Sequence, residues 1–187
     1  MVKIGVLALQ GDYQQHARAL EKAGAHAVEV RTRAELESVD ALVIPGGEST
    51  TMLKLLDREA LFEPLQNFGH QKPVFGTCAG AILLASRVEN PEQPSLGLVN
   101  IAVRRNAYGR QLDSRVATLE SDPFGSIEAV FIRAPIIRET GPDVRVLARY
   151  NGDPVLVEQG RHLVATFHPE LSEDSKVHAY FVGKVSG

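Results

Sequence analysis

Short apolar runs alternate with amphipathic segments through the first half of the chain. A run that is apolar at nearly every position is typical of a strand buried on both faces. Such runs cover residues 3–9, 27–30, 41–44 and 73–75. Helical segments are expected at 12–23, 33–39 and 58–68, and two further helices are expected to end at residues 56 and 85. This alternation predicts an α/β fold, a three-layer sandwich in which helices flank a mostly parallel central sheet.

The second half has shorter, more closely spaced β-like runs. They cover residues 98–103, 114–119, 127–132, 144–148, 154–159 and 163–167, and a last helix is expected over 175–184. Asn151-Gly152 lies between two of these runs and is a strong hairpin signal. Because no repeat or linker divides the chain, residues 1–187 are predicted to form a single domain.

The composition excludes several classes of protein. The formal net charge of −3 gives no indication of binding to nucleic acid or an anionic membrane. The first residues lack the apolar core of a signal peptide, and no apolar run approaches the roughly 20 residues of a membrane span. The single cysteine cannot form an intrachain disulfide, which fits a reducing compartment. We therefore predict a cytoplasmic protein with no nucleic-acid or membrane partner.

That cysteine, Cys78, lies between Gly76 and Gly80, after an apolar run and before a helical one. This order is the strand–turn–helix layout of a nucleophile elbow, with cysteine in place of serine. The glycines would let the chain double back, and the helix N-terminus would favour a thiolate. The alternative is that Cys78 is only a small buried apolar residue, as most lone cysteines are.

His168 is the best candidate for the base that a cysteine nucleophile needs, because it follows the run at 163–167 directly. Pro169 predicts an extended tripeptide, in which Glu170 would point to the same side as His168 and orient its ring. An ordinary loop after a strand is the alternative. His16 and His178 fall within expected helices, where surface or core roles are more usual.

Pro45-Gly46-Gly47-Glu48 follows the run at 41–44 and has the chemistry of an oxyanion hole. The Gly47 N–H could approach a developing oxyanion closely, with the N–H of Ala79 as the second donor. Glu48 is a candidate to bind a substrate ammonium group, and Ser49 is expected to cap the next helix. The alternative is a glycine-rich turn that only opens this helix.

A basic stretch, Arg104-Arg105-Asn106-Ala107-Tyr108-Gly109-Arg110-Gln111, lies between two β-like runs. It is either a solvated hairpin tip or a clamp for a substrate carboxylate, which arginine binds with two hydrogen bonds. Arg133, after the run at 127–132, is a similar candidate.

Together these motifs resemble the class I glutamine amidotransferase family, which has a Cys-His-Glu triad on an α/β sheet. The resemblance narrows to the glutaminase subunits of pyridoxal 5′-phosphate synthases and covers nearly the whole chain. It is carried by Leu9-Gln10-Gly11, Pro45-Gly46-Gly47-Glu48-Ser49-Thr50-Thr51, Gly76-Thr77-Cys78-Ala79-Gly80, Arg105-Asn106-Ala107-Tyr108-Gly109-Arg110-Gln111, Phe131-Ile132-Arg133-Ala134-Pro135 and Phe167-His168-Pro169-Glu170.

The resemblance implies that Cys78 attacks the glutamine carboxamide and forms a thioester, with His168 as base and Glu170 orienting it. It implies an oxyanion hole at Gly47 and Ala79, and Gln10 as a residue that senses the partner. The implied partner is a separate synthase (lyase) subunit that receives ammonia for vitamin B6 synthesis in a hetero-oligomer, and no cofactor or metal is implied. Substrate binding would involve Gly46, Gly47, Glu48, Ser49, Arg105, Ile132 and Arg133.

Two other functions remain open. One is a different class I glutaminase or a γ-glutamyl hydrolase, which would share the triad but would not explain the stretch from Arg105 to Gln111. The other is a non-catalytic sensor of related fold with a reactive cysteine, which would not need a His-x-Glu pair at a late strand end.

Overall fold

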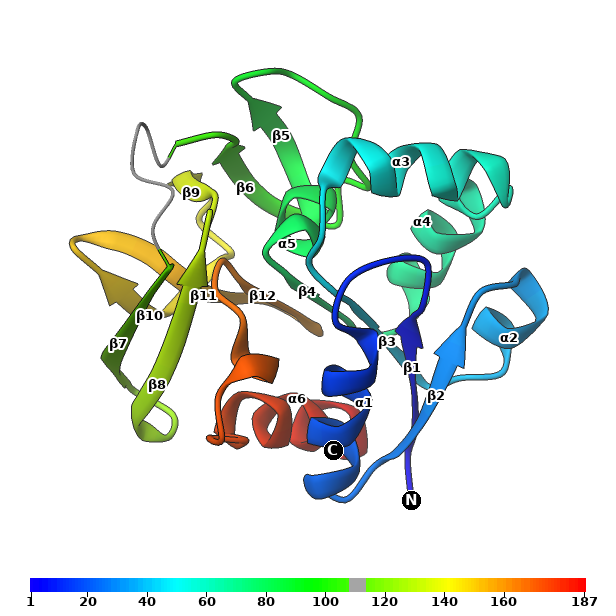
Figure 1. The fold of residues 1–187 in the computed structure, drawn as a ribbon, viewed down its shortest axis with the longest axis horizontal. Coiled ribbons are helices and arrows are strands. Elements are labelled where there is room, and N and C mark those ends of the chain that lie inside the picture. The colour runs from blue at the N-terminus through cyan, green and yellow to red at the C-terminus, as the bar shows by residue number, and fades with distance from the viewer. Residues whose placement is uncertain (108–113) are drawn as a thin grey trace.

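The computed structural model describes residues 1–107 and 114–187 and is built around a seven-stranded sheet (Figure 1). Five neighbouring strands run parallel, while β11 pairs antiparallel with both of its neighbours. In spatial order the strands are β10 (Arg145–Tyr150), β11 (Asp153–Gln159), β12 (His162–Ala165), β4 (Val74–Thr77), β3 (Ala41–Ile44), β1 (Lys3–Leu7) and β2 (His26–Val30). The predicted mostly parallel sheet is confirmed.

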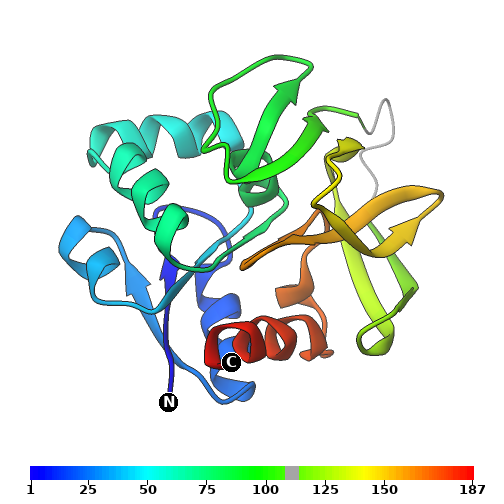
Figure 2. The ribbon, with the colours of Figure 1, turned by 180° about the vertical axis from the view of Figure 1, so that it is seen from behind.

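Helices cover both faces of this sheet (Figures 1 and 2). Leu42 and Ile44 of β3 face one cluster of buried side chains, whereas Ala41 and Val43 face the other. The first cluster receives α2 (Arg33–Glu37), α3 (Ser49–Arg58), α4 (Phe62–Gln71) and α5 (Ala79–Leu84); the second receives α1 (Tyr13–Lys22) and α6 (Lys176–Ser186). A strand that faces two apolar layers must be apolar at every position, which explains the continuous runs.

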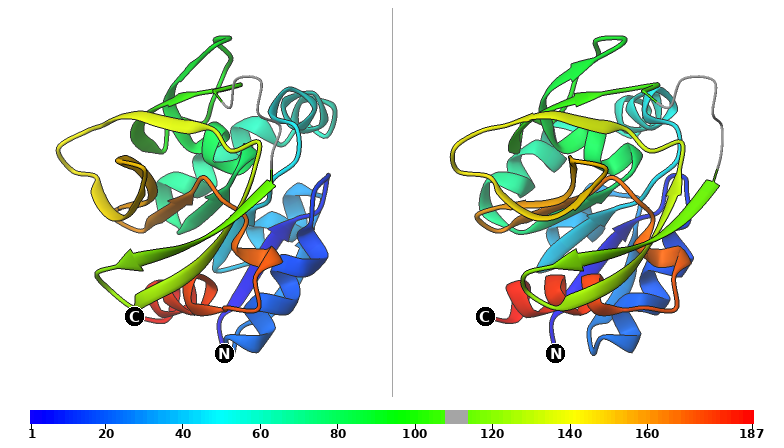
Figure 3. Two further views of the ribbon diagram at one scale, coloured as in Figure 1. Left: turned by 60° about the vertical axis from the view of Figure 1, so that its left-hand side comes forward. Right: turned by 90° about the vertical axis from the view of Figure 1, so that its left-hand side faces the viewer.

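Two smaller sheets complete the fold. One contains β5 (Ala85–Glu89), β6 (Val99–Arg104) and β9 (Ile136–Thr140); the other pairs β7 (Ser114–Ser121) with β8 (Gly125–Ile132). Figure 3 shows the β7–β8 pair beside the C-terminal helix, and side chains of both strands join the cluster on that face. Among the described residues, every helix is too short or too polar to traverse a lipid bilayer.

Several local expectations need correction. The helix expected up to Ala85 ends at Leu84, β5 begins at Ala85, and neither β5 nor β9 was predicted. The cap of α3 is Glu48 rather than Ser49, because the Glu48 carboxylate accepts the N–H groups of Thr50 and Thr51. The Asn151-Gly152 hairpin is confirmed, with both residues at positive φ between β10 and β11.

Candidate active site

Cys78 lies between β4 and α5, in the sharp turn that its flanking glycines predict. Its backbone has φ 52° and ψ −107°, a conformation that costs a residue with a side chain on the order of 1–3 kcal/mol. A Cβ on Gly76 would lie 2.5 Å from the carbonyl oxygen of Gly80, and one on Gly80 would collide with that of Ile44. The neighbouring glycines therefore allow the turn that places Cys78 at the carboxyl end of the sheet.

His168 approaches Cys78 from the neighbouring strand. β12 pairs with β4, and the N–H of Cys78 donates to the carbonyl of Ala165 at 3.0 Å. Burial lowers the pKa of His168, but hydrogen bonds to Cys78 and Glu170 and their charges outweigh this and raise it to about 10. A ring with this pKa carries a proton at pH 7, so His168 holds a proton beside the Cys78 sulfur, where it can be given to a leaving group.

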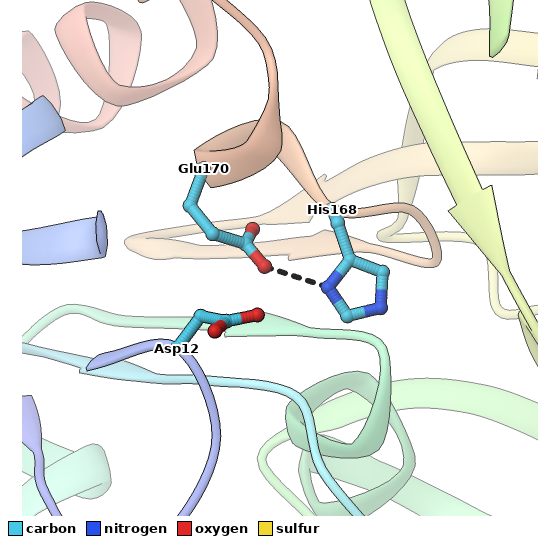
Figure 4. A group of neighbouring side chains, drawn as sticks. All are labelled: Asp12, His168 and Glu170. Atoms are coloured by element: carbon cyan, nitrogen blue, oxygen red, sulfur yellow. Dashed lines mark hydrogen bonds and ion pairs between the residues drawn. The ribbon is translucent and has the colours of Figure 1, made fainter. Parts of the chain in front are cut away.

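Glu170 holds the other side of the imidazole: its Oε1 lies 2.6 Å from Nδ1 of His168 (Figure 4). The expected extended backbone is wrong here, because residues Pro169–Leu171 form a 3₁₀ turn. The fixed φ of Pro169 suits the first position of a helical turn, and Leu171 N–H closes it onto the carbonyl of His168 at 3.2 Å. The turn brings the carboxylate back to the ring.

The glycine pair after β3 packs against these residues. A Cβ on Gly46 would lie 2.7 Å from Cε1 of His168 and 3.2 Å from Cβ of Cys78. Gly47 has φ +128°, and a Cβ there would lie 2.8 Å from Cδ of Gln10. The structure thus brings Gly46 to the triad and Gln10 to Gly47, with Gln10 Nε2 also donating to the carbonyl of Glu48 at 2.7 Å.

Glu48 and Arg105 meet at the rim of the site. Nη2 of Arg105 lies 3.4 Å from Oε1 of Glu48 and 3.0 Å from Oγ1 of Thr50. The Arg105 side chain is 11% exposed, so Arg105 is not the solvated tip of a hairpin. Burial raises the pKa of Glu48, but hydrogen bonds from Thr51 and Thr50 outweigh it, so the net shift is downward.

The other residues predicted to bind substrate are Ser49, Ile132 and Arg133. Ser49 is buried and donates to Oε1 of Gln93 at 3.2 Å. The carbonyl of Ile132 lies 3.9 Å from the Cys78 sulfur, while Arg133, at φ 45°, lines a cavity of about 250 Å³ beside Phe131. The part of the basic stretch from Tyr108 to Gln111 lies outside the described residues.

Known proteins resemble this chain over almost its entire length. Residues 6–187 match the family described as the SNO glutamine amidotransferase family. The chain belongs to that family. Proteins named "Pyridoxal 5′-phosphate synthase subunit PdxT" from Solibacter usitatus and Koribacter versatilis are 59% and 57% identical to it; the alignments cover 99% and 98% of this chain and 100% and 96% of the relatives. The resemblance stated from the motifs is confirmed.

Solved structures support the same assignment. A protein titled "Crystal structure of glutamine amidotransferase" matches with a TM-score of 0.92 at 46% identity, over 98% of this chain and 99% of that one. Another, titled "Structure of PurLQS from Thermotoga maritima", matches with a TM-score of 0.70 at 18% identity, over 100% of this chain and 98% of that one. The second likeness concerns the fold alone.

Asp12 lies beside His168 and Glu170, although it was not among the candidate site residues identified from the sequence. It occupies the N-cap position of α1, but its side chain makes no capping hydrogen bond. Its carboxylate instead lies with His168 and Glu170, one ligand atom of each within 4.8 Å of the others (Figure 4). Ligand atoms on one metal ion stand about 3 Å or more apart. The 2.6 Å between His168 and Glu170 therefore fits a hydrogen-bonded pair better than a metal centre.

Proposed function

We propose that this protein is a glutaminase that converts L-glutamine and water into L-glutamate and ammonia. The observation that carries the proposal is the strained Cys78 beside the His168–Glu170 pair, at the carboxyl ends of neighbouring strands β4 and β12. The family assignment and the names of the relatives support the same reaction and its pathway.

In the first half of the reaction, His168 accepts the thiol proton and the Cys78 sulfur attacks the carboxamide carbon. The carbonyl oxygen gains negative charge, which the N–H groups of Gly47 and Ala79 would stabilise. The C–N bond then breaks, and His168 returns the proton to the departing nitrogen, so ammonia leaves and a γ-glutamyl thioester remains. Glu170 keeps the imidazole in the orientation that both transfers need.

In the second half, His168 takes a proton from water, and the resulting hydroxide attacks the thioester. The C–S bond breaks, the sulfur regains a proton, and glutamate is released. The groups proposed to bind glutamine are Gly46, Gly47, Glu48, Ser49, Arg105, Ile132 and Arg133. The Glu48–Arg105 contact offers opposite charges for the ammonium and carboxylate of an amino acid.

A synthase subunit is the proposed partner, since the relatives are named as subunits of pyridoxal 5′-phosphate synthase. Ammonia is readily protonated in water and then loses its nucleophilicity, so transfer through a dry path within a complex makes chemical sense. Gln10 is proposed to sense docking, because it contacts both Gly47 and Glu48. A single-domain protein with a thiol that must stay reduced suits the cytosol.

The decisive experiment measures glutamate release by the purified chain, without and then with a pyridoxal phosphate synthase subunit. Release that rises when the subunit is added supports both the reaction and the pathway. Release that does not respond to the subunit contradicts the pathway and favours a different glutaminase, while release from γ-glutamyl peptides in preference to glutamine favours a γ-glutamyl hydrolase. No release in either case, with Cys78 reduced, contradicts the reaction and favours a sensor.

A further inference from the structure

Two buried histidines that the reaction above does not use lie behind the triad. His16 of α1 and His178 of α6 are both fully buried, and Nδ1 of His16 lies 2.9 Å from Nε2 of His178. Few polar side chains are buried in these helix faces, and buried polar groups cost free energy unless they are paired. The contact between the rings offsets part of this cost, but Nδ1 of His178 has no hydrogen-bond partner among the described residues, a cost that apolar residues would avoid.

His16 also faces the triad. Its Nε2 lies 3.3 Å from Oε2 of Glu170 and 3.2 Å from Oγ1 of Thr77, the residue before the nucleophile. The Glu170 side chain is fully buried, and Oε1 is taken by His168. Oε2 makes no hydrogen bond with any described residue, and the nitrogen that faces it, at 3.3 Å, is Nε2 of His16, which also hydrogen-bonds with Oγ1 of Thr77.

The protonation of the two histidines follows from their surroundings. Burial, together with the charges of His178 and His168, lowers the pKa of His16 well below 6.5, and burial lowers the pKa of His178 to about 4. Both rings are therefore neutral at pH 7, and each carries one N–H.

The surroundings of His178 and Glu170 determine which ring nitrogen of each histidine carries the hydrogen. Nδ1 of His178 has no hydrogen-bond partner among the described residues. A buried acceptor without a partner is tolerated more readily than a buried N–H, so the hydrogen of His178 belongs on Nε2, where it donates to Nδ1 of His16. His16 then carries its hydrogen on Nε2, facing Glu170. The opposite arrangement would direct a lone pair at the carboxylate.

We propose that His16 is a positioning residue of the reaction, whose Nε2–H holds Oε2 of Glu170 so that Oε1 stays on Nδ1 of His168. The inference deepens the proposed function and rests on it. Asp12 makes this contact more important, because its carboxylate is a second negative group beside Glu170. Without the His16 donor, the Glu170 carboxylate is free to rotate away from the imidazole, and the ring loses its orientation.

Two substitutions of similar size separate positioning from simple packing. In His16→Gln the side-chain amide reaches the place of Nε2 and restores a donor to Glu170. In His16→Asn the amide reaches only the place of Nδ1, beside His178. We expect kcat with the synthase subunit present to stay within about threefold of wild type for His16→Gln. We expect it to fall about 10- to 100-fold for His16→Asn, with KM for glutamine unchanged, as misplaced catalytic groups do.

Melting temperatures of the two His16 variants separate a loss of catalytic positioning from a loss of stability. Equal losses of kcat in both variants, or losses that follow the melting temperature, would mean that His16 only packs between helices and would overturn the proposal. Wild-type kcat in His16→Asn would overturn it as well. A wild type that releases no glutamate, like Cys78→Ala, contradicts the proposed function itself and the inference with it.

Nitrogen-15 NMR of histidine-labelled protein tests the same contact without activity. We expect the His16 signals, identified by their absence from His16→Gln, to show a neutral ring with hydrogen on Nε2 at pH 7. Hydrogen on Nδ1, or a charged ring at that pH, would overturn the proposal even in a fully active enzyme.

Discussion

Adding one methyl group at Gly46 should slow the reaction while leaving the fold intact. In Gly46→Ala the new Cβ would lie 2.7 Å from Cε1 of His168. Ordinary van der Waals contact begins at 3.4 Å, so the imidazole must move by about 0.7 Å. The same Cβ would also press on Cβ of Cys78 at 3.2 Å, so the new methyl group disturbs both residues.

A displacement of about 1 Å in a catalytic group can cost on the order of 100-fold in rate. We therefore expect kcat for glutamate release to fall about 10- to 100-fold, which corresponds to about 1.4–2.7 kcal/mol of lost transition-state stabilisation. The overpacking should lower the free energy of unfolding by only about 1–3 kcal/mol. The protein stays folded at room temperature if its stability is that of an ordinary domain of this size.

The assay is steady-state glutamate release with the synthase subunit present, alongside urea unfolding of each variant. Gly183→Ala is the matched control, because Gly183 lies in α6 and a Cβ there meets nothing within 4 Å. This control should keep wild-type kcat and gain about 0.5–1 kcal/mol from helix propensity. An unchanged kcat in Gly46→Ala would refute the close approach of Gly46 to the imidazole.

Three further predictions concern the triad and the buried histidines. Cys78→Ala should release no glutamate and unfold within about 1 kcal/mol of wild type; residual release would contradict the nucleophile. Glu170→Gln should lose roughly 10²- to 10⁴-fold in kcat yet keep measurable turnover, and a fully active variant would remove Glu170 from the mechanism. His162 and His178 have a pKa of about 4 in the fold, below 6.5, so their neutral forms contribute stability above pH 6.5 that is lost as the pH falls toward 4. The urea midpoint should drop between pH 7 and pH 4.5 by an amount equivalent to about 2–3 kcal/mol for each histidine, and a constant midpoint would contradict their burial as neutral rings.

The elbow at Cys78 and the contact between His168 and Glu170 were predictable because their signals are local. Gly76 and Gly80 stand two residues on either side of Cys78, and the glutamate lies two residues after His168. The contact between His16 and His178 was not predictable, since it joins residues 162 positions apart. The available signal was weak: His16 lies one helical turn before buried Leu20, so it is a titratable residue on an apolar helix face.

Three kinds of local prediction were wrong, each for its own physical reason. Glu48 rather than Ser49 caps α3, because a longer carboxylate can accept two N–H groups at once. Pro169 suits either an extended segment or the first position of a helical turn. The helical turn forms here, and it lets Glu170 contact the ring of His168. The strands β5 and β9 contain charged, exposed residues, so they lack the apolar pattern by which the central strands were recognised.

The central position of β4 has a consequence for how the protein acquires activity during synthesis. One neighbour, β3, is made before it, but the other, β12, is made much later: Val74 N–H and its partner Nδ1 of His162 are separated by 88 residues. At about 5–20 residues per second, a ribosome adds that length in roughly 5–20 s. Throughout this interval the Cys78 elbow lacks His168 beside it, so under the proposed mechanism a nascent chain cannot consume glutamine. Recovery of glutamate release during refolding therefore reports insertion of the last parallel strand, a long-range and intrinsically slow step.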